Sequence, residues 1–204
     1  MYVVVSFEDK IAIQPDKFGR EQADVLVDEI EHKYCNKVVL GVGLCVIFYD
    51  FVEVGVPHIY PGGGSTHQLV KFRMVVFRPD DEEILYGRIS SCDERGVSIS
   101  MHFFDDVRVE RERLPSPVSY SESMREYTWH YCEDGSKQID YKMGVGDQVR
   151  FKVLNCIFPP LIKGTMRERG ASGTGEAQDG PAMKIIASLS GNDASALGCI
   201  HWWR

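Results

Sequence analysis

Residues 70–89 constrain the fold of this chain most, because two strand-like runs follow each other there with only a short turn between them. Along the first run alternate residues are apolar, and the residues between them begin as basic ones. At Val75 and Phe77 the second face becomes apolar too, so something must cover its far end. The nearest cover is the structure that begins directly after Pro79. We therefore predict a rigid joint between two small domains at Val75, Phe77 and Pro79.

The composition is that of an ordinary globular protein, with 44% hydrophobic and 26% charged residues in a chain of 204. This length suits one large domain or two small ones, and from the joint we predict two, with the bounds 1–80 and 81–204. The net charge is −7, and acidic residues outnumber basic ones on both sides of residue 81. Binding of nucleic acid through bulk positive charge is therefore disfavoured, and any contact with RNA must be local, weak or helped by a partner.

The cysteines and the amino terminus indicate an intracellular, soluble protein. Six cysteines are spread at wide spacings without a CxxC pair, and Cys45 and Cys156 lie in apolar runs, as buried reduced thiols do. The apolar start at residues 1–7 is too short for a signal peptide. No apolar stretch approaches the length of a membrane span.

The first half reads as one helix against an antiparallel sheet, which is an α+β domain. A strand is expected from residue 1, and Pro15 then favours a helix start with Asp16 as its N-cap. The helix is predicted over 17–33, and the expected apolar stripe is Ala23, Val27, Ile30 and Tyr34. Asn36 is a plausible stop. Further strands are expected at 38–40, 44–49, 52–60 and 67–77.

The second half reads as all-β, and we predict a small OB-fold barrel of about five strands. Residues 93–96 form a hairpin turn, and 163–181, which is rich in Gly, Ser and Thr, is expected to be a disordered loop. The expected strands lie at 84–90, 97–101, around Trp129, at 149–153 and at 183–187.

Three runs together resemble one known family: Gly43 to Asp50, Pro61 to Ser65, and Val70 to Pro79. They are similar to the larger stalk subunit of RNA polymerases, a family with an archaeal member and one in each eukaryotic nuclear polymerase. The resemblance covers essentially the whole chain and is closest to the RNA polymerase III member. That closer likeness is carried by Phe103 to Asp106, Leu114 to Pro117, the strand around Trp129, Arg150 to Val153, and Trp202 with Trp203.

The resemblance implies a non-catalytic stalk subunit in the nucleus. In this family an N-terminal tip domain docks on the polymerase core, and an OB domain can touch nascent RNA. It also implies a smaller helical stalk subunit, which forms a heterodimer along the joint, and a supporting role in transcription initiation with initiation factors. By match of position and by the backbone freedom of glycine, the expected docking residues are Pro15, Gly43, Pro61, Gly62, Gly63, Gly64 and Ser65.

The predicted RNA contacts depart from the pattern of OB domains that bind RNA. Such domains often present aromatic side chains on the second and third strands, whereas here the outward residues of 97–102 are two serines and a histidine. Asp105 and Asp106 add negative charge nearby. The best remaining candidates for RNA binding are Arg88, His102, Phe103, Arg150 and Lys152.

Other chemistry is weighed against this interpretation. His130 with Cys132, and Cys199 with His201, are ligand-type pairs that two strands could gather around zinc. Structural zinc ligands usually lie two to four residues apart in tight turns, so we expect no metal and no cofactor. No hydrolase elbow, phosphate loop or HExxH motif occurs, so we expect no enzyme. The alternatives are a free-standing OB protein that binds single-stranded RNA, and a stalk subunit of another nuclear polymerase.

Overall fold

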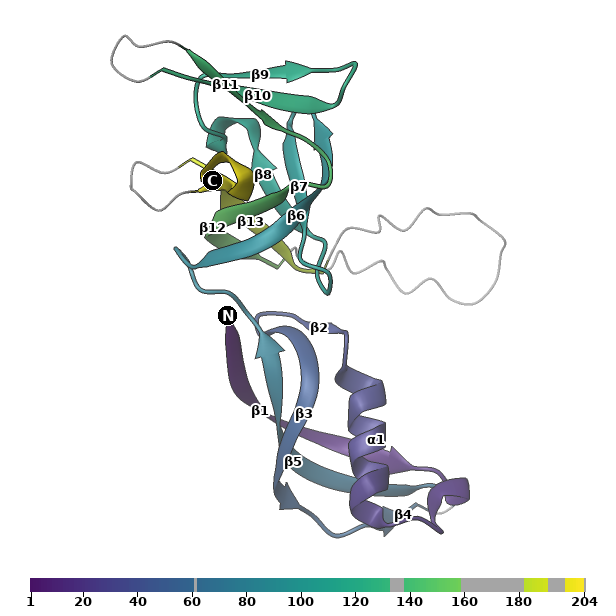
Figure 1. The fold of residues 1–204 in the computed structure, drawn as a ribbon. Helices are drawn as coiled ribbons and strands as arrows, with labels where there is room; N and C mark the ends of the chain where they lie inside the picture. The colour runs from purple at the N-terminus through teal and green to yellow at the C-terminus, as the bar shows by residue number, and fades with distance from the viewer. Residues whose placement is uncertain (61, 133–137, 159–181, 191–196, 204) are drawn as a thin grey trace, which may run out of the picture. The chain divides into compact units, whose positions relative to one another are not determined.

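A computed structural model gives the fold, and it divides into two compact units, Met1–Arg78 and Pro79–Arg204 (Figure 1). The structure describes residues 1–60, 62–132, 138–158, 182–190 and 197–203. The predicted disordered loop at 163–181 lies outside the described residues. No helix in the described part of the chain is long and apolar enough to span a membrane.

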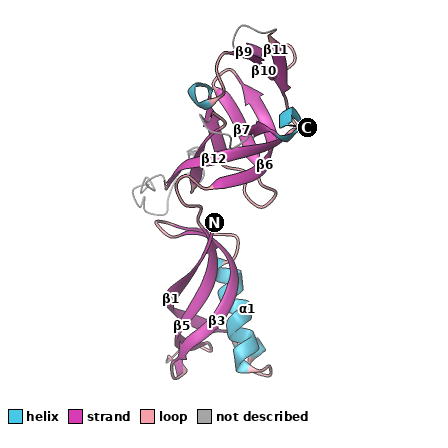
Figure 2. Ribbon diagram, turned by 60° about the vertical axis from the view of Figure 1, so that its left-hand side comes forward, coloured by secondary structure: helices cyan, strands magenta, loops and turns pink. Residues whose placement is uncertain are grey.

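Unit 1 is a single helix on an antiparallel sheet, as predicted (Figure 2). The sheet has the order β1-β5-β3-β2, and β4 pairs with β5. Its elements are β1 (Tyr2–Ile13), the 3-10 helix η1 (Pro15–Lys17), α1 (Gln22–Tyr34), β2 (Val38–Val39), β3 (Gly43–Val54), β4 (His58–Ile59) and β5 (Thr66–Phe77).

The core of unit 1 lies between α1 and the sheet. The predicted inward face of β5 is confirmed, because Val70, Phe72, Met74 and Val76 are fully buried there. Phe72 also stacks on Phe7 of β1, with 5.8 Å between the ring centroids. This packing fixes which face of the sheet points away from the helix.

The predicted helix start and stripe are partly wrong. Pro15 opens only the short turn η1, and α1 begins at Gln22 without a side-chain cap, so Asp16 is not its N-cap. The helix face that packs on the sheet also differs from the predicted one. Of the predicted stripe Ile30 is buried, but Ala23 is exposed, and the other buried side chains of α1 are Val25 and Leu26. The stop is confirmed: Asn36 has a φ of 59°, in the left-handed region that ends helices.

The strands predicted at 44–49 and 52–60 differ from those observed. One strand, β3, contains all of the first run and residues 52–54 of the second, and of the remaining residues only the two of β4 form a strand. The register of β3 against β5 shifts at three places along its length. Such bulges bend a strand, which lets a long strand follow the curved sheet around the helix.

Unit 2 is a closed barrel with the OB arrangement, which confirms the predicted fold class. The strands β6, β7, β8, β13 and β12 follow one another around it, β12 pairs back with β6, and β8 runs parallel to β13. Its elements are β6 (Ile84–Asp93), β7 (Gly96–Ser100), β8 (Val107–Glu110), η2 (Arg111–Arg113), β9 (Val118–Ser121), β10 (Glu126–Tyr131), β11 (Ile139–Met143), β12 (Gln148–Ile157), β13 (Lys184–Ser188), β14 (Gly198–Cys199) and η3 (Ile200–Trp203).

One strand of the predicted barrel lies outside the barrel in the structure. The run around Trp129 is β10, which pairs with β9 and β11 in a separate three-stranded sheet (Figure 1). The third barrel strand is β8, which has only four residues and two inward valines, Val107 and Val109. So short a strand carries little periodicity. The inward faces of the other strands agree with the prediction, since Val97, Ile99 and Phe151 are fully buried.

Candidate functional site

Two predicted docking segments meet at one end of unit 1. An ideal Cβ on Gly64 would lie 3.1 Å from Cγ of Pro15, and Oγ of Ser65 donates to Oε1 of Gln14 over 3.0 Å. Gly62 has a φ of 83°, which L side chains rarely adopt. The structure therefore brings Pro15 together with the glycine loop as expected. Pro61 lies outside the described residues.

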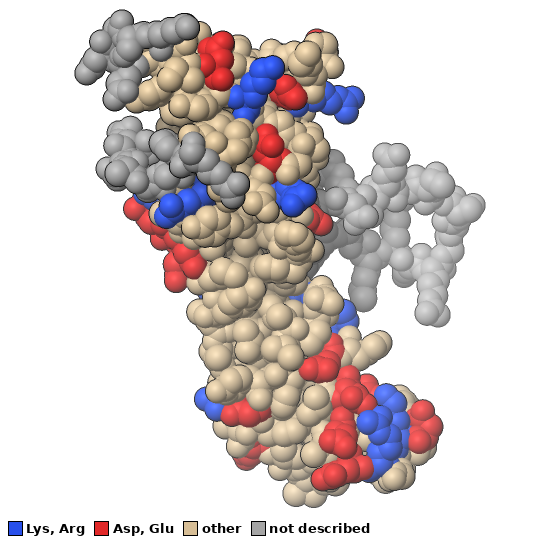
Figure 3. All heavy atoms as spheres, viewed as in Figure 1, with Lys and Arg blue, Asp and Glu red and all other residues tan. Residues whose placement is uncertain are grey.

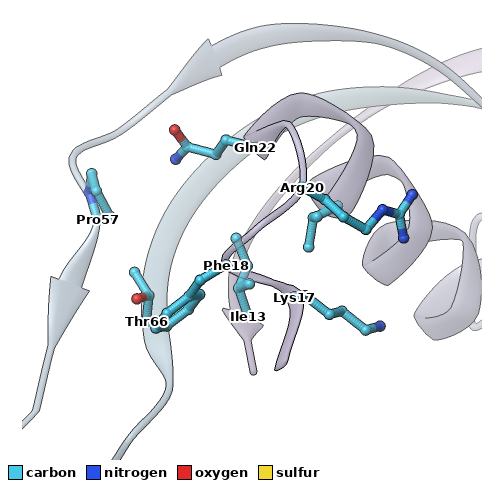
Figure 4. Close-up of a pocket in the computed structure, with 8 residues that line it drawn as sticks. Ile13, Lys17, Phe18, Arg20, Gln22, Pro57 and Thr66 are labelled. Atoms are coloured by element: carbon cyan, nitrogen blue, oxygen red, sulfur yellow. The ribbon is translucent and has the colours of Figure 1, made fainter. Parts of the chain in front are cut away.

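A cavity of about 230 Å³ opens beside these loops, between η1, the start of α1 and β5 (Figure 4). Ile13 and the half-exposed ring of Phe18 give it an apolar lining. Lys17 and Arg20 also line it, but their charged ends are directed to α1, where each pairs with an acid. Lys17 Nζ lies 2.6 Å from Oε1 of Glu29, and Arg20 Nη1 lies 2.7 Å from Oδ2 of Asp28. With its cations paired, the cavity suits an apolar side chain of a partner.

A buried glutamine, which the sequence analysis missed, holds one wall near this cavity. Gln68 is only 2% exposed, and both ends of its amide are satisfied. Its Nε2 donates to the carbonyl of Gly55 over 2.6 Å, and its Oε1 accepts from Nε2 of Gln22 over 2.7 Å. These bonds tie the start of α1 to β5 and to the segment after β3. Gln68 has the same parity as Val70, so strand alternation could have found it.

Gly43 does not join the other docking candidates. It begins β3 beside the end of β5, where an ideal Cβ would lie 2.6 Å from the carbonyl oxygen of Phe77. The glycine loop precedes the opposite end of β5, roughly 35 Å away along a strand of this length. Close backbone approach therefore explains Gly43, and the structure separates it from Pro15.

The three predicted joint residues differ in exposure. Phe77 is fully buried and the ring of Tyr2 packs on it with 5.7 Å between centroids, Pro79 is buried, and Val75 is half-buried. The apolar residues at the end of β5 are thus buried or half-buried. A rigid connection between the two units stays a prediction from the sequence.

The predicted RNA-binding cations come together on the outer face of the barrel. Arg150 of β12 is paired in register with Tyr86 of β6, and Lys152 follows two residues later on the same face. Arg88 lies two residues beyond Tyr86 and is itself paired with Ser100 of β7. Neighbouring strands therefore carry these side chains on one continuous surface.

Tyr86 is the member of this surface that the sequence analysis missed. Its side chain is 59% exposed, and the guanidinium of Arg150 lies 5.7 Å from its ring centroid. Among the described residues neither Arg88 nor Arg150 forms an ion pair, and Nε of Arg150 is buried there without a partner. Lys152 differs, because its Nζ lies 2.9 Å from Oε1 of Glu82. Tyr86 lies two residues before Arg88 on β6, so strand alternation could have placed both on the same face.

The other two RNA candidates lie in the loop after β7, in a more acidic setting. His102 has a φ of 70° and is exposed, and Phe103 is 46% exposed while Phe104 is buried. Ser100 donates from Oγ to Asp105, and burial together with Asp105 raises the pKa of Asp106. On the face shown in Figure 3, positive and negative side chains are interspersed over unit 2. The stronger candidate surface is therefore Tyr86, Arg88 and Arg150, which we name the Tyr86 surface.

Comparison with known proteins decides the family. Residues 83–203 match RNA polymerase III subunit Rpc25, and residues 8–64 match the SHS2 domain found in the N terminus of Rpb7p/Rpc25p/MJ0397. The DNA-directed RNA polymerase III subunit RPC8 of Bos taurus is 33% identical over 100% of this chain and 98% of its own length. The chain belongs to the RNA polymerase III Rpc25 family.

Other relatives are also subunits of RNA polymerases, and the RNA polymerase III subunit is more similar to this chain than the RNA polymerase II subunit is. The rpc8 subunit of Schizosaccharomyces pombe RNA polymerase III is 31% identical over the full length of both chains. The RNA polymerase II subunit RPB7 of Saccharomyces cerevisiae is 25% identical over 77% of this chain. The family resemblance seen in the sequence is thus confirmed, and so is its preference for the polymerase III member.

Proposed function

We propose that this chain is a non-catalytic stalk subunit of nuclear RNA polymerase III. The observation that carries the proposal is the match to RNA polymerase III relatives over both units. Its mechanism is binding and positioning: unit 1 attaches the subunit to the polymerase core, and the barrel offers an auxiliary RNA contact and supports initiation.

Docking on the core is assigned to the end of unit 1 that carries Pro15, Gly62, Gly63, Gly64 and Ser65. The cavity beside them supports this assignment, because an apolar side chain of the core could enter it next to Phe18. Glycine backbone there permits another chain to approach closely. Gly43 is left out of this proposal because of its position at the far end of β5.

The smaller helical stalk subunit is assigned to the face of the unit 1 sheet that points away from α1. Val4 and Ile47 are both paired in register with Val75, one from each neighbouring strand, and Tyr2 is paired with Phe77. Tyr2, Val4 and Ile47 are 47%, 49% and 52% exposed. Adjacent exposed apolar side chains of this kind mark a protein-binding surface. We name Tyr2, Val4, Ile47 and Val75 the outer apolar patch.

Purification of the tagged chain from its own cells tests the proposal. The subunits of RNA polymerase III should co-purify, and depletion of the chain should lower tRNA synthesis. The substitution Phe18→Glu should reduce the recovered polymerase at least about fivefold, because it places a charge at the rim of an apolar cavity. Met124→Glu is the matched control: Met124 is 66% exposed in unit 2, and its loss should leave recovery unchanged.

Two other outcomes would overturn the assignment. A chain that elutes alone at its own mass would be a free-standing OB protein for single-stranded RNA, a function favoured by the Tyr86 surface. Recovery of another polymerase in place of RNA polymerase III would make the chain a stalk subunit of that enzyme.

A further inference from the structure

Three side chains of metal-ligand type meet in unit 2, and neither docking nor RNA binding uses them. They are Asp147, Cys199 and His201, and their ligand atoms all lie within 4.8 Å of one another. We propose that this cluster binds one Zn²⁺ ion through the Cys199 thiolate, the His201 imidazole and the Asp147 carboxylate.

The fold brings the three residues together from two distant segments. Cys199 lies on β14, where it is paired in register with Val149 of β12, and Asp147 is in the turn that precedes β12. His201 follows in η3. The neighbouring Trp202 anchors η3, because its Nε1 donates to the carbonyl of Lys142 over 3.0 Å.

A glycine keeps this anchor in place. Gly198 has a φ of 106°, and an ideal Cβ on it would lie 2.4 Å from the ring of Trp202. Only glycine lets the indole lie so close to the backbone of β14. The turn that presents Cys199 and His201 is therefore held by packing, without a metal.

The carboxylate of Asp147 is held as well, and within the described residues only one of its oxygens accepts a hydrogen bond. The backbone N–H of Gly144 donates to Oδ2 of Asp147 over 2.8 Å. In the part of the chain that the structure describes, the side chains of Asp147, Cys199 and His201 form no other hydrogen bond. A ligand whose other oxygen accepts a backbone N–H is oriented as metal-binding carboxylates commonly are.

The donor set selects zinc over harder cations. A thiolate with an imidazole favours Zn²⁺, whereas Mg²⁺ and Ca²⁺ need oxygen ligands. Tetrahedral zinc places its ligand atoms about 3.5 Å apart, so small side-chain rotations would bring these atoms, which lie within 4.8 Å of one another, to zinc-binding distances. Binding displaces the thiol proton of Cys199 to solvent, and a water molecule takes the fourth position.

Among the described residues, the cluster does not include His130 and Cys132, the other pair considered from the sequence. His130 lies on β10, where Nδ1 is 2.8 Å from Oδ1 of Asp140 and Nε2 is 2.8 Å from Oγ of Ser119. Cys132 is exposed just after β10. The imidazole of His130 is thus bonded to Asp140 and Ser119. The third ligand-type residue beside Cys199 and His201 is Asp147.

Titration of the purified full-length chain with Co²⁺ and Zn²⁺ tests this inference. Co²⁺ should bind with about one equivalent and give the near-ultraviolet charge-transfer band of a cobalt–thiolate bond, and Zn²⁺ should displace it. Cys199→Ser should lose the band. His201→Gln should weaken binding at least about tenfold, and because His201 is exposed this variant should fold like the parent protein without metal.

The double variant His130→Gln, Cys132→Ser is the matched control, because it removes a second Cys and His pair of the same spacing. It should bind cobalt like the parent chain. Loss of binding in this control, an absent thiolate band, or equal affinity in His201→Gln would each overturn the inference. The metal titration needs no polymerase, so its failure would leave the proposed stalk function untouched.

Discussion

At the scale of single residues, two exposed tyrosines each lie near an arginine. They differ in whether the positive charge of that arginine is already paired with a carboxylate. Arg150 lies 5.7 Å from the ring of Tyr86, and Arg73 lies 5.2 Å from the ring of Tyr49. Arg73 also forms two hydrogen bonds to the carboxylate of Asp50, which lower the pKa of Asp50. The positive charge beside Tyr49 is therefore already neutralised, whereas the one beside Tyr86 is available to a phosphate.

This contrast predicts the effect of removing each ring on RNA binding. Tyr86→Ala should weaken the affinity for single-stranded RNA by about 1–3 kcal/mol, the contribution of one stacked base. Arg88→Ala should remove one phosphate contact and so reduce the slope of log K against log salt concentration by about 1. Fluorescence anisotropy with an oligoribonucleotide measures both. Tyr49→Ala is the control and should bind as the parent chain does; equal losses in the two tyrosine variants would contradict the prediction.

At the scale of elements, one charged cluster links the end of α1 to β1. Oδ2 of Asp9 accepts hydrogen bonds from Lys33 Nζ and from the hydroxyl of Tyr34, each over 2.5 Å. Burial would raise the pKa of Asp9, but these hydrogen bonds outweigh burial and the net pKa is lowered. Burial, together with the hydrogen bond to Asp9, raises the pKa of Tyr34.

The lowered pKa of Asp9 predicts how unit 1 responds to acid. A carboxylate with a lowered folded pKa stabilises the fold above its unfolded pKa of about 4, and this stabilisation is lost as the pH falls through the folded value. Asp9→Asn should thus reduce the free energy of unfolding by about 1 kcal/mol at neutral pH, after allowance for solvent screening.

Urea unfolding of the parent chain and of Asp9→Asn at about pH 7 and about pH 3 measures this difference. The two curves should approach each other in acid. Asp24→Asn, at an exposed position in the first turn of α1, is the control and should change stability little at either pH. A difference that grows as the pH falls would refute the assigned role of Asp9.

At the scale of the whole molecule, unit 1 carries apolar side chains that are exposed among the described residues. The outer apolar patch lies on the sheet face away from α1, and ion pairs such as Lys71 with Glu53, 3.0 Å apart, lie farther along that face. A patch with a charged border is typical of a protein interface. An isolated chain with this surface exposed is prone to associate with itself.

Co-expression with the smaller stalk subunit should therefore give a monodisperse heterodimer. The double variant Val4→Ser, Ile47→Ser should lose the partner in size-exclusion chromatography with light scattering, because it removes apolar area that the partner would bury. The control Met124→Ser, Ile139→Ser changes two exposed apolar residues of unit 2 and should keep it. Retention of the partner by both variants would move the interface elsewhere.

Some features of this protein follow from short stretches of sequence. Alternation alone predicted the buried face of β5 and the inward faces of β7 and β12, because the side chains of a strand point to opposite faces in turn. The hairpin between β6 and β7 was also predictable, since Gly96 has a φ of 145° that other residues rarely adopt. The family resemblance was readable because it combined several motifs.

The sequence by itself therefore determined the fold class and the family. Only the tertiary structure decided that β8 completes the barrel in place of β10, that Gly43 lies far from the docking loop, and that Asp147 meets Cys199 and His201. The physical reason is that periodicity is a local property of the backbone. Which residues become neighbours depends instead on strand register between segments that lie far apart in the chain, and packing of the whole unit sets that register.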